Sequence, residues 1–299
     1  MTERDDKSAY AETWDRYVKE DFVRIQSDRP KTPRDLQRWQ VLNTSDDSYA
    51  WPGDEWGDAA AVDHILKTCV FDPIGQETPV HICELASGAG RFTVPVLSRW
   101  PDVKIDCFDV SQAFLDQMHL RFEGPIADGR LETHLLGSNP TGMFETLANK
   151  RLTRRVDAVF SFDAMVHVEL HSLAVYMLTA AFALRPGGLL AMNVADATNA
   201  NGLEKLLCNA PVGFQLGGSV GPQFQFTSPE IVSKLLHSMG FEHTFHDLNG
   251  RDLFIVAHLR DVDAAQQSLR SAGANWWPTG KWRRRAQTLM SKFGREEPS

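Results

Sequence analysis

A short segment around Leu85 places acids and small residues where they can hold a ligand. Glu84 ends an apolar run, and the small residues 86–90 follow as a turn before an expected helix. Small residues let the backbone approach a ligand closely, and amide N–H groups at a helix start can face it. Asp109 ends the next apolar run, about 20 residues later, where a carboxylate can accept both hydroxyls of a ribose. The two acids therefore suit a ligand with a cationic amino group at one end and a ribose in its middle.

The same turn does not fit the fingerprint of a dinucleotide site. Such a site needs a third glycine soon after Gly88 and Gly90, and Thr93 stands near that position. S-adenosylmethionine has the layout that the two acids require.

Five segments resemble, in chain order, the motifs of class I S-adenosylmethionine-dependent methyltransferases. They are Glu84-x-Ala86-x-Gly88-x-Gly90, residues 103–111 with Asp109, residues 156–163, Leu184-Arg185-Pro186-Gly187-Gly188, and residues 226–241. The resemblance covers residues 76–260. It implies a doubly wound, Rossmann-like α/β sheet of seven strands that binds S-adenosyl-L-methionine as its cofactor.

The resemblance also implies which residues contact this cofactor. The turn would hold the methionine end, Asp109 the ribose, and the end of the strand at 156–162 would lie against the methionine part and the methyl acceptor. The full set is Glu84, Ala86, Ser87, Gly88, Gly90, Asp109, Val110, Ser138, Ser161 and Phe162.

Two positions depart from the family's pattern. Ala86 replaces the first glycine, so we expect a negative φ there, because a methyl group is tolerated in that region. Residues 137–139 stand where the family often has an aspartate that contacts the adenine amino group. Only the hydroxyl of Ser138 could replace that aspartate.

The residues just after the strand at 156–162 are the candidates for catalysis. His167 lies on the loop expected to face the methyl group, and a neutral imidazole can take a proton from a hydroxyl. Asp163 stands beside it at the strand end. His167 could equally be a structural histidine that bonds a backbone carbonyl. Asp163 and Asp196 together could hold a divalent ion, but each has an ordinary hydrogen-bonding role, and no metal is predicted.

The order of apolar runs and helical segments divides the chain into three parts. Residues 1–75 are expected to form a helical N-terminal cap, 76–260 the α/β domain, and 261–299 a C-terminal tail. Within the domain, residues 196–226 are expected to be an irregular insertion on the acceptor side. The expected strands are 80–85, 103–110, 131–136, 156–162, 189–194, 241–245 and 253–258, and the expected helices include 111–122, 170–184 and one opened by 227–230.

The two flanks carry most of the tryptophans. These are Trp14, Trp39, Trp51, Trp56, Trp276, Trp277 and Trp282. We expect them to pack over the domain, with stacking on a saccharide as the alternative. Residues 51–58 loosely resemble a segment of bacterial methyltransferases linked to cell-surface polysaccharide. The basic, amphipathic tail after Trp276 would suit peripheral contact with an anionic membrane, the acidic body of the chain or a second copy.

Composition limits the classes of partner and the location. The 299 residues carry a formal net charge of -8, which argues against nucleic acid as a partner. The charged residues after Met1 do not form a secretory signal, and the four widely spaced cysteines form no C-x-x-C pair. We therefore expect reduced thiols in the cytoplasm. The sequence leaves open whether the chain forms a homo-oligomer.

The function that these features predict is transfer of a methyl group to a hydroxyl of a small molecule or saccharide, with His167 as the base. Two alternatives stay open at this point. One is methyl transfer to an amine, and the other is a non-catalytic partner subunit that binds the cofactor.

Overall fold

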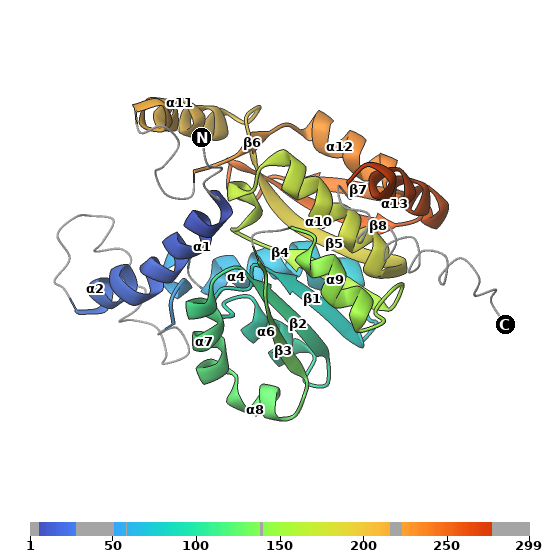
Figure 1. The fold of residues 1–299 in the computed structure, drawn as a ribbon, viewed down its shortest axis with the longest axis horizontal. Helices are drawn as coiled ribbons and strands as arrows, with labels where there is room; N and C mark the ends of the chain where they lie inside the picture. Colours follow the sequence, from blue (N-terminus) through green and yellow to red (C-terminus); the bar gives the residue numbers. More distant parts are fainter. Residues whose placement is uncertain (1–5, 28–50, 58, 138–139, 216–222, 277–299) are drawn as a thin grey trace.

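The computed structural model describes residues 6–27, 51–57, 59–137, 140–215 and 223–276. A mixed sheet forms its centre, with the strand order β3-β2-β1-β4-β5-β8-β7 and a short β6 paired with the end of β5 (Figure 1). Strand β8 runs antiparallel to both of its neighbours, and the other pairs are parallel. The strands are β1 (His81–Leu85), β2 (Lys104–Asp109), β3 (Leu131–Leu135), β4 (Val156–Ser161), β5 (Leu184–Asp196), β6 (Phe226–Thr227), β7 (Phe241–His246) and β8 (Asp252–Leu259). The predicted doubly wound sheet is confirmed, and β6 is an addition to the seven expected strands.

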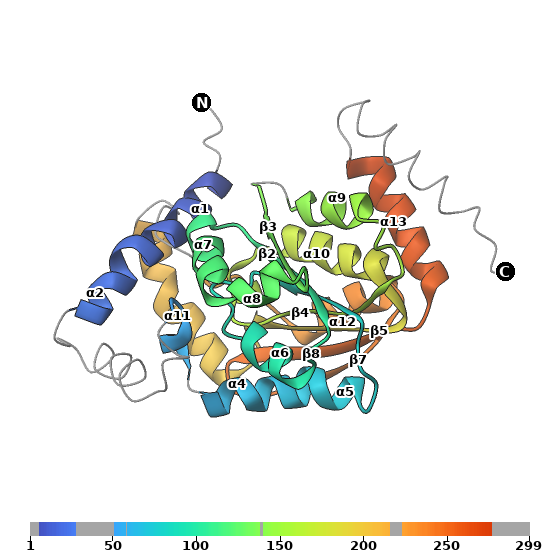
Figure 2. The ribbon, with the colours of Figure 1, turned by 90° about the horizontal axis from the view of Figure 1, so that it is seen from below.

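Helices cover both faces of the sheet (Figure 2). One face carries α4 (Ala59–Leu66), α6 (Thr93–Arg99) and α7 (Gln112–Arg121), and the other carries α9 (Gly142–Asn149), α10 (Leu170–Ala183), α12 (Pro229–Ser238) and α13 (Val262–Trp276). Side chains alternate between the faces, so Ile82 belongs to the core under the first group of helices, whereas Cys83 and Leu85 belong to the other core. The strand order reverses between β1 and β4, which leaves a crevice at their carboxyl ends.

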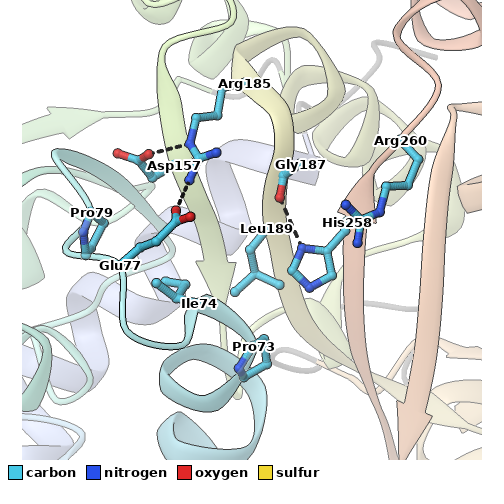
Figure 3. A pocket seen from close by; sticks show the side chains of 10 residues that line it. All are labelled: Pro73, Ile74, Glu77, Pro79, Asp157, Arg185, Gly187, Leu189, His258 and Arg260. Atoms are coloured by element: carbon cyan, nitrogen blue, oxygen red, sulfur yellow. Dashed lines mark hydrogen bonds and ion pairs between the residues drawn. The ribbon is translucent and has the colours of Figure 1, made fainter.

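The entry into β1 is fixed by a cluster of charged groups at the opposite edge of the sheet (Figure 3). The guanidinium of Arg185 contacts Asp157 at 2.6 Å and Glu77 at 2.7 Å. Asp157 also accepts hydrogen bonds from the backbone N–H groups of Val80 (2.7 Å) and His81 (2.9 Å). These contacts line a small cavity of about 260 Å³ and connect the turn after α5 (Asp72–Ile74) to β4 and β5. Since the acids pair with Arg185 and with backbone N–H groups, we read this cavity as structural.

Two expectations about the second half of the chain need correction. Residues 196–226 are not irregular, because they contain the 16-residue helix α11 (Ala200–Gln215). The leucines at 203, 206 and 207 recur at helical spacing, and this pattern outweighs the glycines and asparagines around them. Strand β5 begins at Leu184 rather than at 189, and its register with β4 shifts between Val156 and Ala158 to accommodate the Pro-Gly-Gly sequence.

The other element boundaries agree closely with the sequence. Ser111 accepts a hydrogen bond from Phe114 N–H and begins α7, and Ser228 does the same with Ile231 N–H at the start of α12. The N-terminal flank contains α1 (Asp6–Arg16), a π-helical turn (Tyr17–Asp21), α2 (Phe22–Ser27) and a 3-10 turn (Asp54–Trp56). Trp39, Trp277, Trp282 and most of the basic tail lie outside the described residues. The division of the chain into three parts stays a prediction.

Within the described residues, no helix is long and apolar enough to cross a membrane.

Gly90 shows how tightly the turn after β1 is packed. Its φ is +85°, and a Cβ there would lie 2.3 Å and 2.7 Å from two ring carbons of Phe122. We predict that Gly90→Ala lowers the free energy of unfolding by roughly 2–4 kcal/mol, because left-handed strain and overpacking add. Chemical denaturation measures this difference.

Gly129→Ala is the matched control. Gly129 has a similar φ of +69°, but a Cβ there meets nothing within 4 Å. It should cost only the backbone strain of roughly 1–2 kcal/mol. Equal losses in the two variants would show that Phe122 does not constrain the turn.

Candidate functional site

A cavity of about 830 Å³ opens at the carboxyl ends of β1, β2 and β4. Its volume falls in the range of small-molecule and cofactor sites. Of the ten predicted cofactor residues, six line it: Ala86, Ser87, Gly88, Asp109, Val110 and Phe162. Both predicted catalytic residues, Asp163 and His167, line it as well. The fold therefore brings the turn after β1, the tip of β2 and the loop after β4 around one space.

The turn after β1 is closed by its own backbone. Ser87 N–H donates to Phe108 O (3.1 Å), and Gly90 N–H donates to Ser87 O (2.9 Å). Between them Gly88 has a φ of +55°. The expectation for Ala86 was wrong, because its φ is +57° and not negative. The chain reverses sharply where β1 meets the turn, so Ala86 adopts the left-handed region at a cost of about 1 kcal/mol.

Asp109 connects this turn to the tip of β2. Its carboxylate accepts hydrogen bonds from the backbone N–H groups of Gly88 and Ser111, both at 2.8 Å. Burial raises the pKa of Asp109 to about 6, although these bonds and one from Val110 favour the charged form. A carboxylate has about four lone-pair sites, so it can accept further hydrogen bonds from a ligand in the cavity.

Glu84 does not line the cavity. It has the same parity along β1 as Ile82, so its side chain points to the face covered by α6. There it accepts a hydrogen bond from the hydroxyl of Thr93, and only 2% of Glu84 is exposed. Burial raises the pKa of Glu84 to about 8. Its predicted contact with a cofactor stays a prediction, and in this structure Glu84 supports the start of α6.

Two other predicted cofactor residues, Gly90 and Ser161, are not in the wall. Gly90 packs against Phe122 behind the turn. Ser161 is 1% exposed, and its hydroxyl has no hydrogen-bond partner among the described residues. Ser138 lies outside the described residues, so its contact with adenine stays a prediction.

Asp163 and Arg91 form an ion pair at the wall of the cavity. Asp163 has a φ of +61°, which is strained for a residue other than glycine. Its backbone N–H donates to the buried side chain of Asn193 (2.8 Å), which holds this conformation. The guanidinium of Arg91 also lies over the ring of Phe92, at 4.7 Å from the centroid. Sequence reasoning missed Arg91, although its position directly after the turn places it at the cavity.

His167 lies in the 3-10 turn Met165–His167, between β4 and α10. Its Nδ1 is 3.3 Å from Gln223 O, and a carbonyl can only accept, so the proton is on Nδ1 and Nε2 has a free lone pair. Burial lowers the pKa of His167 below its usual range, so the ring is neutral at pH 7. Its ring contacts Trp14 and Phe224. His167 can therefore bond a backbone carbonyl, the structural role that the sequence left open, and still accept a proton at Nε2.

The N-terminal flank covers the cavity. Trp14 from α1 and Trp56 from the segment 51–57 line it together with Phe114 of α7. The ring centroids of these three lie 5.7–6.3 Å apart. The expected packing of flank tryptophans over the domain therefore holds for Trp14 and Trp56.

Two aspartates, the buried Asp54 and the partly exposed Asp15, hold this cover in place. Asp54 pairs with both terminal nitrogens of Arg121 at 3.1 Å, and Arg121 also donates to Ala89 O in the turn (3.0 Å). Asp15 of α1 accepts from the Ser111 hydroxyl at 2.6 Å. Asp54 and Asp15 thus connect the cover to the turn and to the tip of β2.

The two aspartates considered for a metal have different surroundings. Asp163 lines the cavity, whereas Asp196 is absent from its wall. Asp196 instead accepts hydrogen bonds from the backbone N–H (2.8 Å) and hydroxyl (2.7 Å) of Thr198. This is the ordinary role that the sequence offered as the alternative.

The same architecture occurs in solved methyltransferase structures. Magnesium protoporphyrin IX methyltransferase from Synechocystis PCC 6803, with bound SAH, aligns with a TM-score of 0.55 at 15% identity over 85% of this chain and all of the other. The chain has the class I methyltransferase fold. Geranyl diphosphate C-methyltransferase from Streptomyces coelicolor A3(2) aligns equally well, with a TM-score of 0.55 at 13% identity over 85% of this chain and 97% of that one.

A third structure, an O-methyltransferase family protein from Burkholderia thailandensis, aligns with a TM-score of 0.51 at 15% identity over 84% of this chain and 69% of that one. No family model matches the sequence, and no curated protein matches it. The comparisons that identify this fold are therefore comparisons of structure.

Glu84 provides a test of the geometry behind the turn. Its pKa is about 8 in the folded chain and about 4.5 in the unfolded chain, so the folded state keeps a proton that the unfolded state loses. Stability is therefore full below the unfolded pKa and falls as the pH rises toward 8. We predict that Glu84→Gln raises the melting temperature relative to the native protein, and more so at about pH 8 than at about pH 5.

Glu204→Gln, at an exposed position of α11, should show no such dependence. A stability difference for Glu84→Gln that does not change with pH would contradict the buried position of the carboxyl.

Proposed function

We propose that this chain is an S-adenosylmethionine-dependent methyltransferase whose acceptor is a hydroxyl of a small molecule or saccharide. The main support is that Asp109, the turn after β1 and the neutral imidazole of His167 all line one cavity. In this fold, ligands bind at the carboxyl edge of the sheet where the strand order reverses. The similar structures named above are methyltransferases, which supports the choice of reaction.

The residues present fit S-adenosylmethionine. Asp109 is in the wall and has acceptor capacity left for a ribose hydroxyl, while Gly88 N–H keeps its carboxylate in place. Arg91 and Asp163 bring a cation and an anion to the same wall, and these match the carboxylate and the ammonium of the methionine part. When bound, the cofactor supplies a methyl group on a positively charged sulfur.

His167 has the properties of a base for a hydroxyl acceptor. Its Nε2 lone pair is free because Nδ1–H donates to Gln223 O. Its low pKa keeps that lone pair available at neutral pH. The acceptor oxygen would lose its proton to Nε2 as its bond to the methyl carbon forms and the bond between that carbon and sulfur breaks, with sulfur keeping the electron pair. The carbonyl of Gln223 then stabilises the imidazolium and keeps the ring oriented.

Methyl transfer also requires an acceptor site that excludes water and fits the acceptor. The cover formed by α1 and residues 51–57 supplies this. Trp14 and Trp56 add flat apolar rings to the wall, and Trp14 contacts the ring of His167. Such rings can stack on a planar acceptor or on the apolar face of a sugar. Excluding water protects the reaction and strengthens the hydrogen bonds within the cavity.

Asp109→Asn tests the cofactor half of the proposal. We predict that the affinity for S-adenosylmethionine, measured by calorimetry, falls roughly 10- to 100-fold, because hydrogen bonds to a charged acceptor are lost. The affinity of the native protein should also fall as the pH drops through about 6, where Asp109 takes up a proton. Asp116→Asn, on the exposed side of α7, is the control and should bind normally. Unchanged binding by Asp109→Asn would remove the assignment.

His167→Ala tests the base. With an acceptor found by screening hydroxylated compounds for S-adenosylhomocysteine release, we predict a loss of turnover of roughly 10²–10⁴-fold with unchanged cofactor affinity. In the native protein turnover should fall as the pH drops through the lowered pKa of His167. His171→Ala, whose side chain is 96% exposed, should keep full turnover.

Two results would contradict the role of His167. Full turnover in His167→Ala would remove the base. A rise in acceptor KM at nearly unchanged kcat would favour an amine acceptor that His167 only positions.

A further inference from the structure

A second polar cluster lies on the face of the sheet covered by α9 and α10, apart from the cavity. Three adjacent strands contribute side chains that point to this face, and Lys150 at the end of α9 adds an ammonium group. The cluster consists of His81 and Cys83 from β1, Asp106 from β2, Glu132 and His134 from β3, and Lys150. None of these residues is in the wall of the 830 Å³ cavity, so the proposed methyl transfer does not use them.

Asp106 is at the centre of this cluster and divides it into two halves. Its Oδ2 lies 2.5 Å from Nε2 of His81, and its Oδ1 lies 2.5 Å from Nε2 of His134. Cys83 is the direct register partner of Asp106 in the parallel pair of β1 and β2. The ligand atoms of His81, Cys83 and Asp106 all lie within 4.8 Å of one another.

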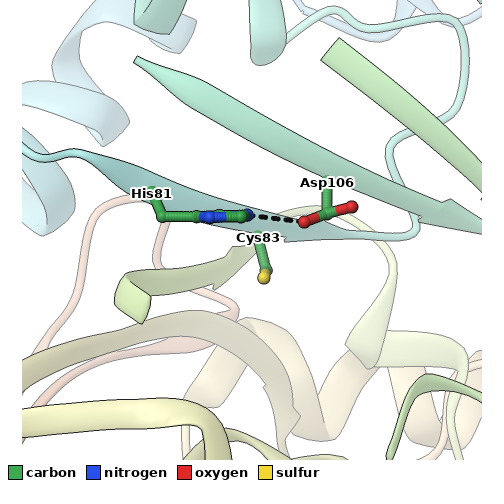
Figure 4. Close-up of side chains that lie close together, drawn as sticks. All are labelled: His81, Cys83 and Asp106. Atoms are coloured by element: carbon green, nitrogen blue, oxygen red, sulfur yellow. Dashed lines mark hydrogen bonds and ion pairs between the residues drawn. The ribbon is translucent and has the colours of Figure 1, made fainter. Parts of the chain in front are cut away.

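The half that contains Glu132 already holds a cation. The ammonium of Lys150 contacts Oδ1 of Asp106 and lies 2.8 Å from Glu132. On the other half, His81 is the partner that Oδ2 has among the described residues. Figure 4 shows the imidazole and the carboxylate facing each other, with the thiol of Cys83 below them.

We propose that His81, Cys83 and Asp106 form a site for Zn²⁺. An imidazole nitrogen, a thiolate sulfur and a carboxylate oxygen are the three ligand types that zinc takes in proteins, and water can supply the fourth position of a tetrahedron. The side chain of His81 is 14% exposed and that of Asp106 is 1% exposed, so the site lies closest to solvent at His81. Because β1 and β2 both contribute ligands, the ion would join the two strands on the face covered by α9 and α10, outside the wall of the cavity.

Charge and proton balance agree with a divalent ion. The cluster has two carboxylates and one ammonium, and with a neutral thiol it carries one net negative charge. Zn²⁺ that displaces the thiol proton of Cys83 leaves the cluster neutral. Nε2 of His81 must offer its lone pair, so its proton is carried on Nδ1 in the metal-bound state. Since binding releases the thiol proton, affinity should rise with pH.

The test uses the full chain and Co²⁺ as a spectroscopic probe for the zinc position. After dialysis against a chelator, we expect one Co²⁺ per chain, a thiolate-to-cobalt absorption band in the near ultraviolet and visible bands typical of tetrahedral cobalt. One equivalent of Zn²⁺ should remove these bands and raise the melting temperature. Their absence from the native protein, or clearly fewer than one ion per chain, would overturn the proposal without any variant.

The variants Cys83→Ala and Cys107→Ala show which cysteine provides the thiolate ligand of the metal. Both thiols are fully buried and free, but Cys107 belongs to the core on the opposite face of the sheet. We expect Cys83→Ala to lose the thiolate band and Cys107→Ala to keep it. His81→Ala should weaken zinc binding at least 10-fold, because one of three protein ligands is gone. A thiolate band that persists in Cys83→Ala would assign the metal to another cysteine and would refute the site.

Discussion

The buried carboxylate of Asp109 is the contact on which the shape of the cavity depends. It accepts hydrogen bonds from Gly88 N–H and Ser111 N–H, and these two groups belong to the turn after β1 and to the start of α7. One side chain thus fixes the distance between the first two strand tips. The arrangement keeps a negative charge at the wall of a largely apolar space, which is costly unless hydrogen bonds compensate for lost hydration. The raised pKa of Asp109 reflects the cost of burying this charge.

Other contacts around the cavity involve the residues that Asp109 holds. The hydroxyl of Ser111, next to Asp109, donates to Asp15 and so attaches α1. The turn that Asp109 holds also presents Ala89 O to Arg121, which in turn pairs with the buried Asp54. A rigid pocket and an aromatic cover are therefore parts of one hydrogen-bonded system. On the far side, Asn193 holds the strained backbone of Asp163 and so positions the partner of Arg91.

The sequence was sufficient for the sheet because periodicity and turn chemistry carry that information. The strands, the cap at Ser228 and the position of Asp109 follow from short apolar runs and the residues that end them. Side-chain direction at the strand end was less accessible. Glu84 was expected to face a ligand, yet its parity with Ile82 directs it toward Thr93, and this signal was available in the alternation of β1. The helix α11 was missed because glycine and asparagine masked its leucine spacing.

The φ of Ala86 and the ion pair of Arg91 show what local sequence cannot reveal. Ala86 adopts its φ beside Ser87, whose N–H donates to Phe108 O of β2, and the pairing of Arg91 with Asp163 joins residues 72 positions apart. Both depend on the assembled sheet. The central claim, that a sulfonium nucleoside lies between Asp109 and His167, is tested most directly by a crystal structure of the chain with S-adenosylhomocysteine. The account predicts its ribose on the Asp109 carboxylate and its sulfur facing His167. A ligand bound elsewhere, or a cavity that stays empty at saturating concentration, would contradict it.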